Sequence, residues 1–76
     1  MVTAYITVKA HTGEADRLKT DIERFDGVER AHIIAGDFDL IAIANVDSPA
    51  DVKDIAATKI QSVDGVSNTQ TYIAME

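Results

Sequence analysis

The hydrophobic pattern predicts a strand and then a helix at the start of the chain. Over residues 2–9, apolar and polar side chains alternate, as in a strand with one buried face. Over residues 14–25, apolar side chains recur at helical spacing and charged side chains fill the other face. Thr12 stands where the N-cap of this helix is expected. The apolar positions of the two elements are Val2, Ala4, Ile6, Val8, Ala15, Leu18, Ile22 and Phe25.

Two apolar runs in the middle of the chain predict a hairpin. Residues 28–35 and residues 38–46 are rich in strand-forming side chains, and Gly36-Asp37 between them is typical of a tight turn. The second run is apolar on both sides: Ile41 and Ile43 alternate with a longer apolar set. That set is Phe38, Leu40, Ala42, Ala44 and Val46.

A second helix and a last strand complete the pattern. Ser48 is suited to the N-cap and Pro49 to the first helical position. An apolar stripe follows, and residues 66–74 are expected to form the final strand. The stripe consists of Val52, Ile55, Ala56, Ile60 and Val63.

An internal repeat supports the order β-α-β-β-α-β. The corners Phe25-Asp26-Gly27-Val28 and Val63-Asp64-Gly65-Val66 have the same pattern, 38 positions apart. Two such units predict an α+β, ferredoxin-like fold, with a four-stranded antiparallel sheet and two helices on one face. Since the strand over residues 38–46 is apolar on both sides, its second side needs cover from another subunit. We therefore expect a dimer or a larger homo-oligomer.

The length of the chain and its net charge bear on the number of domains, on self-association and on the class of binding partner. The 76 residues make one domain, 1–76, and a domain this small is only marginally stable as a monomer. Since it has no cysteine for a disulfide or a thiolate metal site, we expect self-association to supply the additional stability. The formal net charge of -6 disfavours direct binding to nucleic acid. The sequence shows neither a signal peptide nor a transmembrane stretch, so we expect a cytoplasmic protein that does not bind membranes.

Catalytic chemistry is not indicated. The two histidines, His11 and His32, lie far apart without metal-ligand spacing, and both are interpreted as bystanders. Neither a nucleophile motif nor a phosphate-binding glycine loop is present. We therefore expect no catalytic residues, no metal site, no cofactor and no enzyme activity.

Two short runs are candidates for binding a small molecule. Gly36-Asp37-Phe38-Asp39 either serves turn geometry or offers backbone amides to an anion and carboxylates to an ammonium group. Thr69 and Thr71 either reflect strand propensity or add hydroxyl contacts from one face of the last strand.

Together these runs resemble a known family. The Gly36–Asp39 turn, the second helix, Gly65-Val66 and Thr69-x-Thr71 occur in the order found in the effector-binding (C-terminal, RAM-type) domain of Lrp/AsnC transcription regulators. The resemblance covers essentially the whole chain. Two departures are that only Met1 precedes the first strand, where the family usually has a helix-turn-helix, and that Ala35 stands where Thr is frequent.

The resemblance implies a stand-alone sensor domain without its own DNA-binding domain. Its expected partners are an amino-acid effector, further copies of itself and full-length Lrp/AsnC regulators. Its implied ligand-binding residues are Gly36, Asp37, Phe38, Asp39, Thr69 and Thr71. Two alternatives share the fold: an ACT-like regulatory domain of a metabolic enzyme, and a small dimeric α+β-barrel monooxygenase with a polar cavity between sheet and helices.

Overall fold

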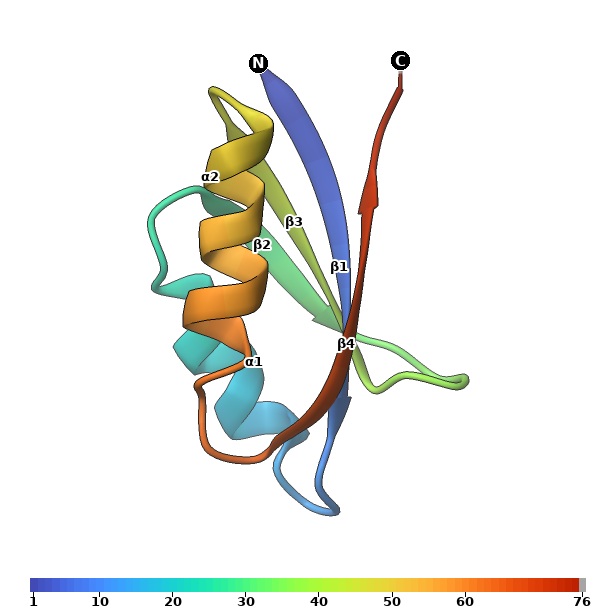
Figure 1. Ribbon diagram of the computed structural model, residues 1–76. Helices are drawn as coiled ribbons and strands as arrows, with labels where there is room; N and C mark the ends of the chain where they lie inside the picture. The colour runs from blue at the N-terminus through green and yellow to red at the C-terminus, as the bar shows by residue number, and fades with distance from the viewer. Residues whose placement is uncertain (76) are drawn as a thin grey trace.

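The computed structural model describes residues 1–75 and consists of one sheet with helices on one side (Figure 1). Four antiparallel strands lie in the order β2-β3-β1-β4. This confirms the predicted ferredoxin-like α+β fold. The elements are β1 (Val2–Ala10), α1 (Ala15–Glu23), β2 (Val28–Ile33), β3 (Leu40–Val46), α2 (Pro49–Lys53), the π-helical segment η1 (Asp54–Ile60) and β4 (Val66–Ile73).

The core lies between the sheet and the helical layer. Alternation puts every second side chain of the central strands β1 and β3 on the helix side, and the apolar stripes of both helices pack onto them. The core is purely apolar within residues 1–75. Its buried members are Ala4, Ile6, Val8, Leu18, Ile22, Ala31, Leu40, Ala42, Ala44, Val52, Ile55, Ala56 and Ile60.

The repeated corner has the same geometry in both halves. The amide of Val28 donates to the carbonyl of Phe25 at 3.1 Å, and the amide of Val66 donates to the carbonyl of Val63 at 3.2 Å. The intervening Gly27 and Gly65 have φ values of +92° and +101°, which L side chains rarely adopt. The repeat in the sequence therefore encodes one helix-to-strand turn used twice.

The first helix begins later than the sequence predicts. Its N-cap is Glu14 instead of Thr12, and it ends at Glu23 instead of residue 25. The reason is a turn in which the Glu14 amide donates to the His11 carbonyl at 3.1 Å and Gly13 has a φ of +83°. This turn contains the expected N-cap, Thr12, so the helix begins at Ala15.

The predicted tight turn at residues 36–37 is wrong. Strand β2 ends at Ile33 and β3 begins at Leu40, so residues 34–39 form a longer loop. The Ile34 amide donates to the Asp39 carbonyl at 2.9 Å and closes its base, while the Asp39 amide donates to the Val8 carbonyl at 3.0 Å. Phe38 and Asp39 therefore lie in the loop, and strand alternation does not set their directions.

The second helix begins as predicted but changes its winding. Ser48 is the N-cap and Pro49 the first residue, yet the helix continues from Asp54 to Ile60 with π-helical bonding. The Gln61 amide closes this segment by donating to the Ala56 carbonyl at 3.3 Å. An apolar stripe does not distinguish the two windings, so the sequence pattern did not predict this change.

The Glu23 side chain of α1 accepts a hydrogen bond from the backbone of the outer strand β2. Glu23 accepts from the Ala31 amide at 3.1 Å and from Lys19 Nζ at 3.1 Å. These hydrogen bonds, the backbone one first, hold the pKa of Glu23 below its ordinary value. The interaction satisfies an amide at the edge of the sheet, where unpaired backbone groups otherwise invite association with another strand.

No helix within residues 1–75 is both long enough and apolar enough to cross a membrane.

Candidate ligand-binding site

Thr69 and Thr71 point to the helical side of the sheet. In the antiparallel register, Thr69 pairs with Val8 and Thr71 with Ile6, whose side chains belong to the core. Directly opposed residues share a face, so both hydroxyls lie on the side of α2 and η1. Because β4 is an outer strand, these threonines lie at the margin of the core.

A pocket of about 390 Å³ lies between β4 and the second helix. This volume falls within the range of small-molecule sites. Gln61 Nε2 donates to Thr69 Oγ1 at 2.8 Å across the pocket, and Ile73 contributes apolar surface that is 42% exposed. We call it the α2–β4 pocket; its lining residues are Pro49, Val52, Lys53, Ala56, Ala57, Gln61, Thr69, Thr71 and Ile73.

The loop over residues 34–39, called the hairpin loop below, is the second candidate region. Gly36 has a φ of +151° and is exposed, with open space where a Cβ would lie. Asp37 is exposed, and its carbonyl accepts from Lys9 Nζ at 3.1 Å. Asp39 is half-buried, and its Oδ2 accepts from the Ala10 amide at 2.8 Å. One of the two predicted ligand carboxylates therefore already has a partner within the chain.

A single subunit does not bring the two regions together. The hairpin loop projects from the side of the sheet opposite the helices (Figure 1), whereas Thr69 and Thr71 face the helical layer. The residues lining the α2–β4 pocket include none from the loop. Contact between the loop and the pocket would therefore require two subunits.

The sheet face opposite the helices carries a row of large side chains, which we call the open face. Tyr5 pairs with Ile43 on one side and with Tyr72 on the other, and Arg30 continues the row beyond Ile43. Tyr5 is 39% exposed and Tyr72 is 56% exposed. Ile41 lies two residues from Ile43 on the same face and is half-buried. The predicted two-sided apolar strand is confirmed as a structural feature.

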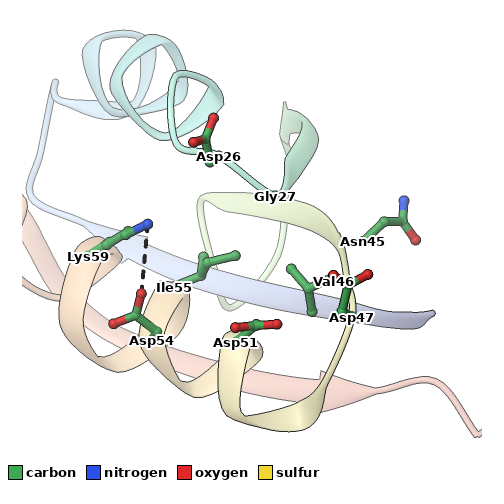
Figure 2. Close-up of a pocket in the computed structure, with 9 residues that line it drawn as sticks. All are labelled: Asp26, Gly27, Asn45, Val46, Asp47, Asp51, Asp54, Ile55 and Lys59. Atoms are coloured by element: carbon green, nitrogen blue, oxygen red, sulfur yellow. Dashed lines mark ion pairs between the residues drawn. The ribbon is translucent and has the colours of Figure 1, made fainter.

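A second pocket, of about 310 Å³, lies where the corner after α1 meets the second helix (Figure 2). Four aspartates and Lys59 contribute its charges, and Lys59 Nζ lies 3.7 Å from an oxygen of Asp54. Its excess of carboxylates opposes an anionic ligand group. The remaining lining residues are Asp26, Gly27, Asn45, Val46, Asp47, Asp51 and Ile55.

Within residues 1–75, no three histidine, cysteine, aspartate or glutamate side chains are grouped so that they could hold a metal ion.

Sequence reasoning missed several residues of the α2–β4 pocket. The sequence pattern assigns no ligand-binding role to Lys53, Gln61 or Ile73. One signal for Lys53 was present: the positions three and four residues away hold Ala50, Ala56, Pro49 and Ala57, none of which can pair with an ammonium group.

The ferredoxin-like fold, the small-molecule pocket on one side and the apolar open face on the other fit a regulatory binding domain. The chain belongs to the Lrp/AsnC ligand binding domain family, whose family model matches residues 3–76.

Two curated relatives are transcription regulators. The chain is 32% identical over 75 residues to an HTH-type transcriptional regulator of Pyrococcus furiosus, covering 99% of this chain and 50% of the relative. It is 29% identical over 55 residues to the leucine-responsive regulatory protein of Haemophilus influenzae, covering 72% of this chain and 33% of that protein. The chain thus spans half or less of the length of these relatives.

Solved structures show the same fold. A protein of Thermus thermophilus matches with a TM-score of 0.95 at 24% identity, over 100% of this chain and 95% of that one. A transcriptional regulator of Neisseria meningitidis, solved in complex with L-Met, matches with a TM-score of 0.84 at 16% identity, over 99% of this chain and 50% of that one.

Proposed function

We propose that the chain senses an amino acid and self-associates as one regulatory domain in transcription control. The observation that carries the proposal is the α2–β4 pocket, which places Thr69 and Thr71 beside apolar side chains in a chain of the Lrp/AsnC ligand-binding family. The name of the leucine-responsive relative and the L-Met complex of the Neisseria regulator support an amino acid as effector.

Self-association rests on the open face. Tyr5, Ile43 and Tyr72 form an adjacent apolar row that no element of the chain covers within residues 1–75. A second copy offers the same row and buries both, as in a symmetric dimer. The hairpin loop projects on that side, so assembly brings it toward other subunits (Figure 1).

The effector site is completed between subunits in this proposal. The α2–β4 pocket of one subunit supplies Thr69 and Thr71, and the hairpin loop of another supplies Gly36, Asp37 and Phe38, with Asp39 holding the loop in shape. An effector that contacts both parts binds the assembled form more tightly. It therefore shifts the assembly equilibrium by its differential affinity, without catalysis.

The two alternatives from the sequence differ in their support. Within residues 1–75 the buried core between sheet and helices is apolar, and the α2–β4 pocket lies at its margin. This arrangement favours a binding domain over a monooxygenase with a polar cavity inside the core. The ACT-like alternative has the same topology but acts on a metabolic enzyme, whereas the curated relatives are transcription regulators. We therefore assign the role to transcription control.

Calorimetry with a panel of amino acids tests the proposal directly. We expect at least one amino acid to bind with one site per subunit, and Thr71→Val to weaken it because the substitution removes a hydroxyl at nearly constant volume. If the wild type shows no heat of binding with any of the amino acids, the chain is not an amino-acid sensor.

A further inference from the structure

The α2–β4 pocket is unusual in its charge. The chain has a formal net charge of -6, yet none of the residues that line this pocket within residues 1–75 is acidic. Among these described lining residues, Lys53 is the single ionisable one. The other large pocket, at the corner after α1, has four aspartates and one lysine. The α2–β4 pocket is therefore the better place for an anionic group.

Lys53 lacks an ion-pair partner within residues 1–75, although this chain is rich in carboxylates. Lys19 pairs with Glu23 at 3.1 Å, and Lys59 on the same helix as Lys53 pairs with Asp54 at 3.7 Å. Lys53 has only alanine and proline three and four residues away along the helix. Its ammonium group is thus available to a ligand at the rim of the pocket.

The rest of the lining suits an uncharged side chain. Val52 and Ala56 are buried at the base, and Ile73 and Ala57 present exposed apolar surface. The Thr69 hydroxyl already accepts from Gln61 at 2.8 Å. A basic ligand side chain would enter a pocket without a carboxylate and with one ammonium group, which is unfavourable on both counts.

We infer that the effector is an amino acid with an uncharged, apolar side chain, held in the α2–β4 pocket with its carboxylate paired to Lys53. The inference rests on the proposed sensing function and adds the ligand class and a specificity-determining residue to it. The ammonium of the effector stays outside the pocket, where the hairpin loop of another subunit supplies the carboxylate of Asp37.

Calorimetry on the whole chain tests this with four probes: leucine, methionine, lysine and leucinamide, which keeps the ammonium and side chain of leucine but has no carboxylate. The pH is set so that leucinamide is protonated. We expect leucine or methionine to bind, and we expect the affinity for lysine and leucinamide to be lower by about ten-fold or more. This factor corresponds to the loss of one charge-assisted hydrogen bond. In Lys53→Ala the difference between leucine and leucinamide disappears. Lys59→Ala, a lysine on the same helix outside the pocket, keeps it.

Different failures have different meanings. If lysine binds as tightly as leucine, or if Lys53→Ala leaves the preference for leucine over leucinamide intact, the ligand class is wrong while amino-acid sensing stands. If no amino acid binds, both the inference and the sensing proposal fail. If Ala57→Phe, which fills the pocket, leaves leucine binding unchanged, the effector does not enter the α2–β4 pocket and the inference is overturned.

Discussion

Replacing Asp39 with alanine removes the acceptor that holds the hairpin loop against β1. Strand β3 begins at Leu40, which pairs with Val8, so the Ala10 amide lies beyond the last pair of that ladder. Asp39 Oδ2 replaces a strand carbonyl there, accepting from the Ala10 amide at 2.8 Å. A hydrogen bond to a charged acceptor contributes about 1.5–3 kcal/mol. Because both residues are half-buried, water partly replaces it, and we expect the lower end.

A loss of about 1.5 kcal/mol lowers the melting temperature of a domain of this size by roughly 6–12 °C. Thermal unfolding followed by circular dichroism at fixed protein concentration measures this shift, since assembly makes it concentration-dependent. Asp39→Asn keeps a neutral acceptor and is expected to lose about half as much. Asp37→Ala is the matched control; its side chain is exposed and the change stays within about 0.5 kcal/mol.

The same variants separate positioning from ligand contact. If Asp39 acts by holding the loop, Asp39→Asn retains effector binding and Asp37→Asn weakens it, because only the latter removes a carboxylate offered to the ligand. If Asp39→Ala has the same melting temperature as the wild type, or if Asp39→Asn is as unstable as Asp39→Ala, the hydrogen bond from the Ala10 amide to Asp39 does not stabilise the protein as argued.

Three further predictions concern assembly, nucleic acid and pH. Ile43→Asp places a carboxylate between Tyr5 and Arg30 on the open face, so light scattering at micromolar concentration should show the 8.2 kDa chain, and an unchanged oligomer would contradict the assigned interface. The 76-residue chain alone, with a net charge of -6, should not bind DNA at near-physiological salt; sub-micromolar, salt-sensitive binding in a fluorescence-anisotropy titration would disprove this. The lowered pKa of Glu23 means that its contribution to stability is present above the ordinary value of 4.5 and is lost as the pH falls through the lower folded-state pKa. The stability difference between wild type and Glu23→Gln should therefore shrink on acidification below about 4.5, and a difference that grows would show that Glu23 is not stabilised as the carboxylate.

The sequence was sufficient for the features that follow from periodicity. Alternation in β3 placed Leu40, Ala42 and Ala44 in the core and left Ile41 and Ile43 opposite them, because side chains on a strand have only two directions. The two Asp-Gly corners were predicted for a similar reason: glycine at positive φ and a break in the apolar stripe are local properties.

Other features depend on contacts between distant segments. The hairpin loop was expected to be a two-residue turn, but Asp39 hydrogen-bonds to Val8 and Ala10 of β1 as well as to Ile34. The sequence of a turn motif does not predict which distant amide will donate a hydrogen bond to its carboxylate. The direction of Asp39 therefore followed from tertiary structure and not from the motif.

The candidate site was predicted in part. The resemblance named Thr69 and Thr71, and the register of β4 puts both in one pocket. The same reasoning grouped them with residues 36–39, which a single subunit places on the opposite side of the sheet (Figure 1). A site completed between subunits cannot be located from one chain's periodicity, since the second partner is not a neighbour in sequence.

Native mass spectrometry with and without leucine is the most direct test of amino-acid-dependent assembly. The account predicts oligomers of the 8.2 kDa chain that gain the mass of leucine and change in relative abundance when it is added, while lysine causes neither change. Spectra with the same oligomer distribution and no bound amino acid, across leucine and the rest of the amino-acid panel, would contradict it.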